Sequence, residues 1–273
     1  MIRRPAVAGH FYPGEPEALG QAVDFCLREA GTSRFPAETR VDALACIVPH
    51  AGYPYSGPVA GAVYRRLTPP SRVILVGPRH FPEGRPMAIV SEGEWLTPLG
   101  AARIDAELAS ELKRACPLLR EDAVAHEHEH ALEVQLPFLQ RIAREFTFVP
   151  IVLGTIVLAA LEELGEAMAR VAAGRGPVLV VASSDMNHYE SDSLTRPKDR
   201  MAIAKILELD PTGLYETVRE HDISMCGFAA AVAALFAARR LGASEAELVS
   251  YATSGDVTGD REAVVGYAGI LLR

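Results

Sequence analysis

Three apolar, β-prone stretches run directly into polar side chains that could bind a metal or move a proton. These stretches end at Pro49, Gly77 and Ala182, and the polar side chains that follow them are His50, His80, Asp185 and His188. In open α/β sheets, ligands bind beyond the carboxyl ends of the strands, because the loops converge there. We therefore expect these four side chains to share one edge of a sheet.

Cys226 adds a sulfur to this set. It stands with Gly227 at the start of an Ala-rich segment that reaches Arg240 and reads as a buried helix. A thiol at a helix N-terminus has its thiolate stabilised by the helix dipole, so we expect the pKa of Cys226 to fall. Two imidazoles, a thiolate and an adjacent Asp/His pair are ligand types that borderline transition metals accept. The sequence therefore predicts a metal-type site.

Each of these residues also has a purely structural interpretation. A histidine after a strand often serves as a capping or hydrogen-bonding residue. An unpaired cysteine such as Cys226 is often a small core residue, and Asp185 could simply cap the turn after its strand. The functional interpretation depends on all of these residues meeting at one edge of the sheet.

A second group of histidines lies in the run His126-Glu127-His128-Glu129-His130. This run follows a charged stretch, so we expect His126 and His128 to lie at the surface. Glu129 and His130 stand at the start of the next helical segment. We expect these two residues either to contact the site or to cap that helix.

The elements that would position these side chains alternate between two patterns. Short apolar, β-rich runs predict strands, at 43–49, 72–77, 87–90, 146–153, 177–182, 248–252 and 264–272. Runs with helical spacing and stop residues predict helices, at 16–30, from Ser56-Gly57-Pro58 onward, and at 105–116, 130–144 with a kink at Pro137, 157–173 and 226–240. The polar stretches 31–38 and 191–199 read as loops. Strands separated by such helices predict one α/β domain, 1–273, with a mixed, mostly parallel central sheet and helices on both faces.

Composition and motif content limit the classes of function. The chain has 273 residues, with 27 Lys and Arg against 35 Asp and Glu and a net charge of −8, so no nucleic-acid partner is expected. The longest apolar run, Phe228–Ala238, is too short for a membrane helix, and no signal-peptide pattern opens the chain. Four scattered cysteines favour a reducing, cytoplasmic location. Phosphate-binding glycine motifs and a Gly-x-Ser-x-Gly motif are absent, so neither a phosphate-cradling loop nor a serine hydrolase is supported.

Six motifs, in order along the chain, together resemble one family. They are Ala8-Gly9-His10-Phe11-Tyr12-Pro13, Pro49-His50-Ala51-Gly52-Tyr53-Pro54-Tyr55-Ser56-Gly57, Gly77-Pro78-Arg79-His80, Glu129-His130-Ala131-Leu132-Glu133-Val134-Gln135-Leu136-Pro137-Phe138, Ser183-Ser184-Asp185 with His188, and Met225-Cys226-Gly227. This set is similar to the Memo family (mediator of ErbB2-driven cell motility), and more closely to its prokaryotic branch, AmmeMemoRadiSam system protein B. The resemblance extends from Arg4 to the C-terminal strand.

This resemblance implies a fold similar to the class III extradiol ring-cleaving dioxygenases, which use non-haem Fe(II). It implies that the family's metal-site residues fall on His50, His80 and Cys226. The Asp and His of the family's Ser-Ser-Asp motif match Asp185 and His188. An aromatic residue that lines the family's pocket matches Phe11.

Two departures from these patterns bear on the metal. Cys226 stands where the dioxygenases carry a carboxylate, and a softer thiolate favours copper or zinc more than a carboxylate does. Phe81 follows His80, where many family members carry a second histidine. We therefore expect iron or copper, with zinc as a third option.

Three kinds of function fit these observations. The first is a metal-dependent oxidoreductase, in which His188, oriented by Asp185, acts as acid or base. Its small substrate would contact Phe11, Tyr53, Tyr55 and His130. The second is a non-catalytic module that binds a peptide or protein, for which the resemblance implies an AMMECR1-like protein and a radical SAM enzyme as partners. The third is a metal chaperone or store.

Overall fold

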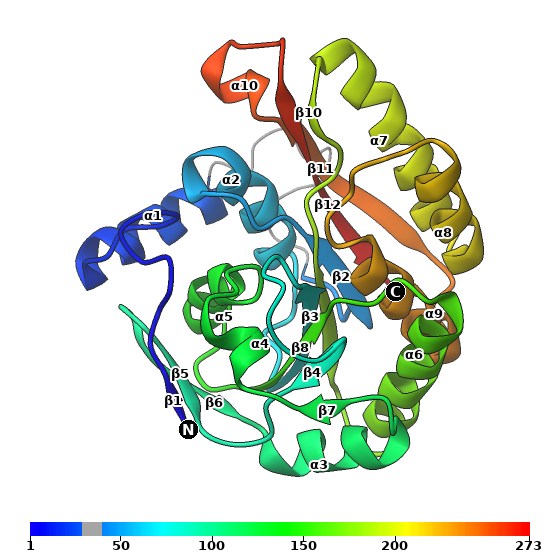
Figure 1. The fold of residues 1–273 in the computed structure, drawn as a ribbon. Coiled ribbons are helices and arrows are strands. Elements are labelled where there is room, and N and C mark those ends of the chain that lie inside the picture. Colours follow the sequence, from blue (N-terminus) through cyan, green and yellow to red (C-terminus); the bar gives the residue numbers. More distant parts are fainter. Residues whose placement is uncertain (29–39) are drawn as a thin grey trace.

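The computed structural model describes residues 1–28 and 40–273, so the expected loop at 31–38 and the expected helix end near residue 30 lie outside the described residues. Strands and helices alternate along the chain (Figure 1). The strands are β1 (Ile2–Arg3), β2 (Ala45–Val48), β3 (Arg72–Pro78), β4 (Met87–Ile89), β5 (Glu94–Thr97), β6 (Gly100–Ile104), β7 (Arg120–Glu121), β8 (Thr147–Leu153), β9 (Leu179–Ser183), β10 (His188–Glu190), β11 (Ala246–Thr253) and β12 (Val264–Leu272). The helices are α1 (Pro16–Arg28), α2 (Tyr53–Tyr64), α3 (Ala106–Ala115), α4 (Val124–Glu127), the 3-10 helix η1 (Glu133–Gln135), α5 (Leu136–Ile142), α6 (Leu158–Ala173), α7 (Asp192–Leu207), α8 (Pro211–Glu220), α9 (Phe228–Arg240) and α10 (Gly255–Thr258).

One mixed sheet of twelve strands runs through the described residues. Its main path has the order β1-β5-β6-β8-β3-β9-β2-β12-β10, with β11 paired to β12 and β4 paired to β7 and β8. The central strands β8, β3, β9 and β2 are parallel, whereas β12 pairs with β2 in the antiparallel direction. This arrangement confirms the predicted α/β fold with a mixed sheet. It also brings the carboxyl ends of β2, β3 and β9 to the same edge.

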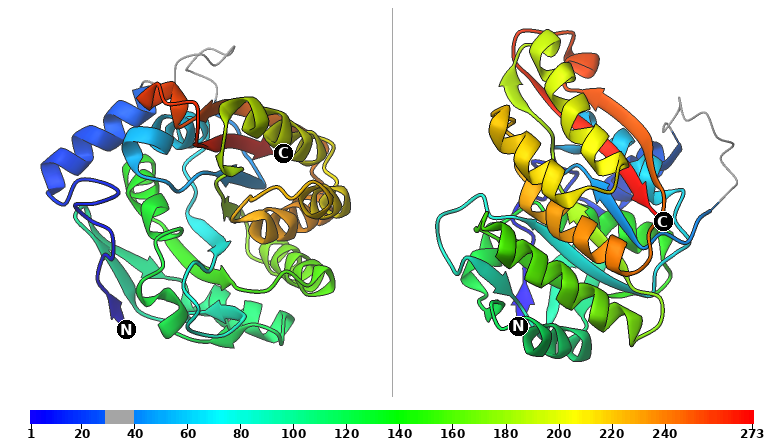
Figure 2. Two further views of the ribbon diagram at one scale, coloured as in Figure 1. Left: turned by 45° about the horizontal axis from the view of Figure 1, so that its top comes forward. Right: turned by 90° about the vertical axis from the view of Figure 1, so that its right-hand side faces the viewer.

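The two faces of the sheet carry separate hydrophobic clusters. Along β2, Ala45 and Ile47 belong to one cluster, and Cys46 and Val48 belong to the other. This alternation is the period-2 geometry of a strand buried on both faces. The first cluster is covered mainly by α3, α6, α7, α8 and α9, and the second by α1, α2 and α5. Figure 2 (right) shows the helices of the first group in front of the sheet.

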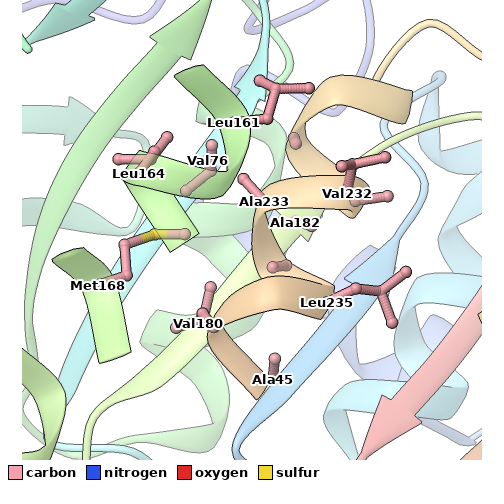
Figure 3. Packing of buried hydrophobic residues seen from close by; sticks show 14 of the residues in the cluster. Ala45, Val76, Leu161, Leu164, Met168, Val180, Ala182, Val232, Ala233 and Leu235 are labelled. Atoms are coloured by element: carbon pink, nitrogen blue, oxygen red, sulfur yellow. The ribbon is translucent and has the colours of Figure 1, made fainter. Parts of the chain in front are cut away.

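The Ala-rich helix α9 packs on β9, β3 and β2 and lies beside α6 (Figure 3). Its alanines let it approach its neighbours closely. A Cβ added at Gly165 of α6 would lie 2.4 Å from Phe236 Cβ and 2.7 Å from Ala233 O, so only glycine fits at this crossing. Because α9 is held this tightly, the residues just before it, including Cys226, have a well-defined position.

Several predicted elements differ from the observed ones. The stretch 191–199, expected to be a loop, contains the first half of α7, because its polar residues lie on a helix that buries only Thr195 and Asp199 in this part. Helix α2 begins at Tyr53 with Pro54 in its first turn, and Pro58 lies inside the helix rather than at its start. The expected kinked helix at 130–144 is instead η1 followed by α5, with Pro137 in the first turn of α5.

Among residues 1–28 and 40–273, no helix combines the length and the apolar character needed to span a bilayer. This finding agrees with the short apolar runs of the sequence.

Candidate metal centre

Three potential metal ligands meet at the shared sheet edge. One donor atom each from His50, His80 and Cys226 lies within 4.8 Å of the other two. Cys226 Sγ is 3.2 Å from His50 Nε2. Around a tetrahedral ion with bonds of roughly 2.1 Å to nitrogen and 2.3 Å to sulfur, neighbouring ligand atoms lie about 3.5 Å apart. The three side chains therefore fit a single transition metal ion after small adjustments.

His50 presents an unprotonated Nε2 to this centre. Its Nδ1 is 3.0 Å from Ser183 Oγ, and this hydroxyl donates its own proton to Ala131 O at 2.6 Å. The Nδ1–H of His50 must therefore be the donor to Ser183, which leaves the Nε2 lone pair available. Burial, together with the nearby His80, lowers the pKa of His50 to about 3, so the ring is neutral.

His80 is oriented by a buried carboxylate. Glu129 accepts the backbone N–H of His80 at 2.6 Å and contacts its Nδ1 at 2.9 Å. A carboxylate accepts hydrogen bonds, so Nδ1 carries the proton and Nε2 is the free nitrogen. Carboxylate–histidine pairs of this kind orient and strengthen metal-binding imidazoles. Glu129 thus contacts the site, as one of the two roles expected for it.

Cys226 lies just outside the first turn of α9, which begins at Phe228. Its sulfur accepts the Asp185 N–H at 3.3 Å. Burial and the neighbouring Asp185 carboxyl raise the pKa of this thiol well above its usual range, so the predicted fall in its pKa is wrong for the protein alone. Desolvation of the buried thiolate is the largest cause of this rise. A bound cation would favour the thiolate.

Asp185 and His188 also reach the centre, but their pairing differs from the prediction. The Asp185 carboxylate accepts the His50 backbone N–H at 2.7 Å, and burial raises its pKa. His188 is oriented by Ser224, which accepts the His188 N–H with Oγ at 2.8 Å and contacts Nδ1 with its carbonyl oxygen at 2.9 Å. Asn187 in turn accepts from both Ser224 N and Ser224 Oγ at 3.0 Å. Ser224 rather than Asp185 thus contacts His188 Nδ1, although an Asp185 carboxylate oxygen lies within 4.8 Å of a His188 ring nitrogen.

These groups open onto a pocket of about 690 Å³. Phe11, Tyr55 and His130 line it, and the His130 ring stacks on His80 with centroids 4.5 Å apart. Tyr53 does not line the pocket: its side chain lies in the core, and its hydroxyl donates to Val134 O at 2.8 Å. His10 and Tyr189 line the pocket without having been predicted, although both adjoin predicted site residues.

The group of histidines at 126–130 divides differently from the prediction. His128 is exposed, as expected. His126 is fully buried, with its ring 5.8 Å from that of Trp95 and its Nδ1 2.9 Å from Asp122 O. The surface position predicted for His126 is therefore wrong, because its ring packs against Trp95 while the adjacent Glu127 and His128 are exposed.

Comparison with other sequences identifies relatives along the whole chain. The profile of the family described as Memo-like protein matches residues 3–271. A MEMO1 family protein of Methanopyrus kandleri is 44% identical over 283 residues, which cover 100% of this chain and 99% of the relative. A MEMO1 family protein of Pyrobaculum arsenaticum is 42% identical over 276 residues, covering 99% and 98% of the two chains.

A solved structure shares the fold. The uncharacterized protein JW3007 from Escherichia coli K12 superposes with a TM-score of 0.56 over 82% of this chain and 98% of that chain, at 12% sequence identity. This likeness concerns the fold alone, whereas the full-length sequence matches identify the family. The chain belongs to the Memo family.

Proposed function

We propose that this protein binds one transition metal ion through His50, His80 and Cys226 and acts as an oxidoreductase on a small molecule in the adjoining pocket. One observation carries the proposal. Three neutral or ionisable donors of the right types lie within 4.8 Å of one another, and all three line a pocket large enough for a small ligand. The first two of them have their second ring nitrogen already engaged by protein groups.

The donor set bears on the identity of the metal. Two imidazoles and a thiolate suit copper, iron and zinc, and leave coordination positions open toward the pocket. We propose iron or copper as the working metal, with zinc as the alternative. When bound, such an ion supplies redox or Lewis-acid chemistry.

The chain's own residues supply the remaining functions. His188 has Nδ1 engaged by Ser224, so its Nε2 is free to hold or release a proton at the pocket. Phe11 packs on His130 with ring centroids 4.7 Å apart and forms an apolar wall. Tyr55 lines the pocket and is 40% exposed, which places it at the solvent side of the pocket.

The first experiment measures metal content. Protein purified under chelation and reconstituted anaerobically with Fe(II), copper or zinc should bind one ion per chain. Failure to hold any of the three at that ratio would overturn the proposal.

The second experiment separates catalysis from binding. Oxygen uptake is measured with a panel of small aromatic diols, on the wild type and on His188→Ala. Removal of a general acid or base typically costs 10²–10⁴-fold in turnover, so we expect a loss of at least about 100-fold with metal content unchanged. Equal turnover of the two proteins would argue against an acid–base role.

A non-catalytic binding role is a second candidate, favoured by one observation. Tyr189 lines the pocket, is 78% exposed and has a positive φ of 60°, a strained backbone conformation for a non-glycine residue. Exposed aromatic side chains of this kind suit binding of a peptide or protein. Co-purification with an AMMECR1-like protein or a radical SAM enzyme tests this role, and it predicts that His188→Ala has no effect on the interaction.

A further inference from the structure

His80 depends on its loop contacts for its orientation. It lies two residues beyond the end of β3, and its side chain is 29% exposed. Its ring is held by Glu129, which itself lies between α4 and η1 rather than on a regular element. The position of the Glu129 backbone therefore decides where the His80 ring points.

Arg3 holds this backbone from the far end of the sequence. Its guanidinium donates from Nε to His126 O at 2.7 Å and from Nη2 to Glu129 O at 2.7 Å. One planar group thus fixes both ends of the segment 126–129. A lysine ammonium has no such fork and cannot reproduce the two bonds in this geometry.

Arg3 is itself fixed by the sheet and by a buried acid. In the register of β1 and β5 it lies opposite Trp95, and its guanidinium carbon is 4.1 Å from the Trp95 ring centroid. Its third contact, Nη1 to Glu133 Oε2 at 2.7 Å, pairs two side chains that are 2% and 0% exposed. The N-terminal strand lies beside β5 in Figure 1. These contacts bury the Arg3 guanidinium and fix its position. We call the Arg3 guanidinium, with its bonds to His126 O and Glu129 O, the clamp.

Glu133 also binds residues 6–12 of the N-terminal segment through hydrogen bonds. Besides Arg3, its carboxylate accepts the N–H groups of Ala6 and Val7 at 2.7 and 3.0 Å and the Tyr12 hydroxyl at 2.6 Å. Phe11, next to Tyr12, lines the pocket. One buried carboxylate thus joins the loop that supports His80 to the segment that supplies an aromatic wall.

We propose that Arg3 is a positioning residue for metal binding: its guanidinium holds the 126–129 segment so that Glu129 presents His80 to the ion. This inference rests on the proposed metal site. Without the clamp, the loop must be ordered at the moment of binding, and that ordering reduces affinity.

The test compares two buried arginines. Arg3→Lys keeps the positive charge opposite Glu133 but loses the fork. Arg66→Lys is the matched control, because Arg66 is 4% exposed and pairs bidentately with Glu247 at 2.9 and 3.2 Å, near the amino end of β2 and away from the pocket. Dissociation constants for Zn²⁺ and Fe(II) are measured by chelator competition, and urea unfolding midpoints are measured on the same samples.

We expect Arg3→Lys to bind metal about tenfold more weakly, at the lower end of the 10–100-fold losses found for groups that support metal ligands. Arg66→Lys should keep the wild-type metal affinity, even if its urea unfolding midpoint falls as much as that of Arg3→Lys. Arg3→Lys combined with Glu129→Gln should lose little more than Glu129→Gln alone, because both act through His80.

The outcomes distinguish this inference from the proposed function. A wild-type protein without stoichiometric metal overturns the proposed function and the inference together. A metal-binding wild type whose affinity is matched by Arg3→Lys overturns the inference alone. If Arg3→Lys yields no folded protein, Glu133→Gln replaces it, with an expected loss of a few-fold, and unchanged affinity in that variant is equally fatal to the inference.

Discussion

His50 and His80 occupy equivalent positions, yet the protein holds them in different ways. Each lies two residues beyond the end of a central parallel strand. His50 is 1% exposed, and the partner of its ring, Ser183, lies on β9, directly opposite Val48 in the register with β2. The His80 side chain is 29% exposed, and its partner, Glu129, lies on a connecting segment. The sheet holds the first ring, whereas a loop carboxylate holds the second.

The two candidate ligands of this site are therefore held in position by two different means. On the His50 side, core packing confines the ring even if a hydrogen bond is lost. On the His80 side, orientation depends on one carboxylate and on the clamp that holds it. The two sides should therefore respond differently to the removal of a supporting group, and equally to the removal of a ligand.

The largest effect is expected from removing the Cys226 sulfur, the candidate ligand that adjoins both histidines. Cys226→Ser replaces a soft thiolate by a hydroxyl that stays protonated, so we expect metal affinity to fall by more than about 100-fold, beyond the range for supporting groups. Cys116→Ser is the control, because that cysteine is buried in the helix-covered core and does not line the pocket. Chelator competition on both variants gives the comparison. Equal affinities would remove Cys226 from the ligand set.

The second prediction concerns the two supporting groups. Glu129→Gln removes the charge that orients His80, and we expect a 10–100-fold loss of metal affinity. Ser183→Ala removes the partner of the His50 ring, but because that ring is enclosed, we expect a loss of only a few-fold, about 1 kcal/mol for one neutral hydrogen bond. A larger loss in Ser183→Ala than in Glu129→Gln would contradict the distinction between the two sides.

The sequence alone predicts the strand-held part of the site better than the loop-held part. Strands buried on both faces are continuous apolar runs, so β2, β3 and β9 and the residues after them could be located. Hairpin strands β5 and β6 mix polar with apolar residues and were not predicted. Arg3 and Glu133 are 130 residues apart, and nothing in either local pattern indicates their contact.

The tyrosines of α2 give a second lesson about prediction. Tyr53 and Tyr55 are two residues apart on a helix, so their side chains point about 200° apart. Only one of them can face the pocket, and it is Tyr55. Helical periodicity would have separated the two tyrosines had the start of α2 been placed at Tyr53 rather than near Ser56.

The third prediction compares two glycines near candidate ligands: Gly227, next to Cys226, and Gly77, three residues before His80. A Cβ at Gly227 would lie 2.3 Å from Ser183 O and 2.8 Å from Ser184 Cα, so backbone must move. We expect Gly227→Ala to cost about 1–3 kcal/mol in unfolding free energy and to displace Cys226. A Cβ at Gly77 would meet mainly the tip of Leu132, at 2.7 Å, which can rotate away. Gly77→Ala should cost under about 1 kcal/mol. Urea unfolding measures both, and similar costs would contradict the expectation that Gly227 is more tightly enclosed than Gly77.

The smallest expected effect is a pH dependence on the loop side. Burial lowers the pKa of His126 to about 4, against about 6.5 in an unfolded chain. Between these values the unfolded chain binds a proton that the folded protein does not, so stability is present above pH 6.5 and is lost as the pH falls toward 4. Between pH 7 and 5.5, His126 should account for a loss of about 1 kcal/mol. His126→Phe keeps a ring against Trp95 but cannot titrate. Urea unfolding of metal-free protein at the two pH values should therefore give a smaller decrease for this variant than for the wild type, and equal decreases would mean that His126 is charged or solvated in the folded protein.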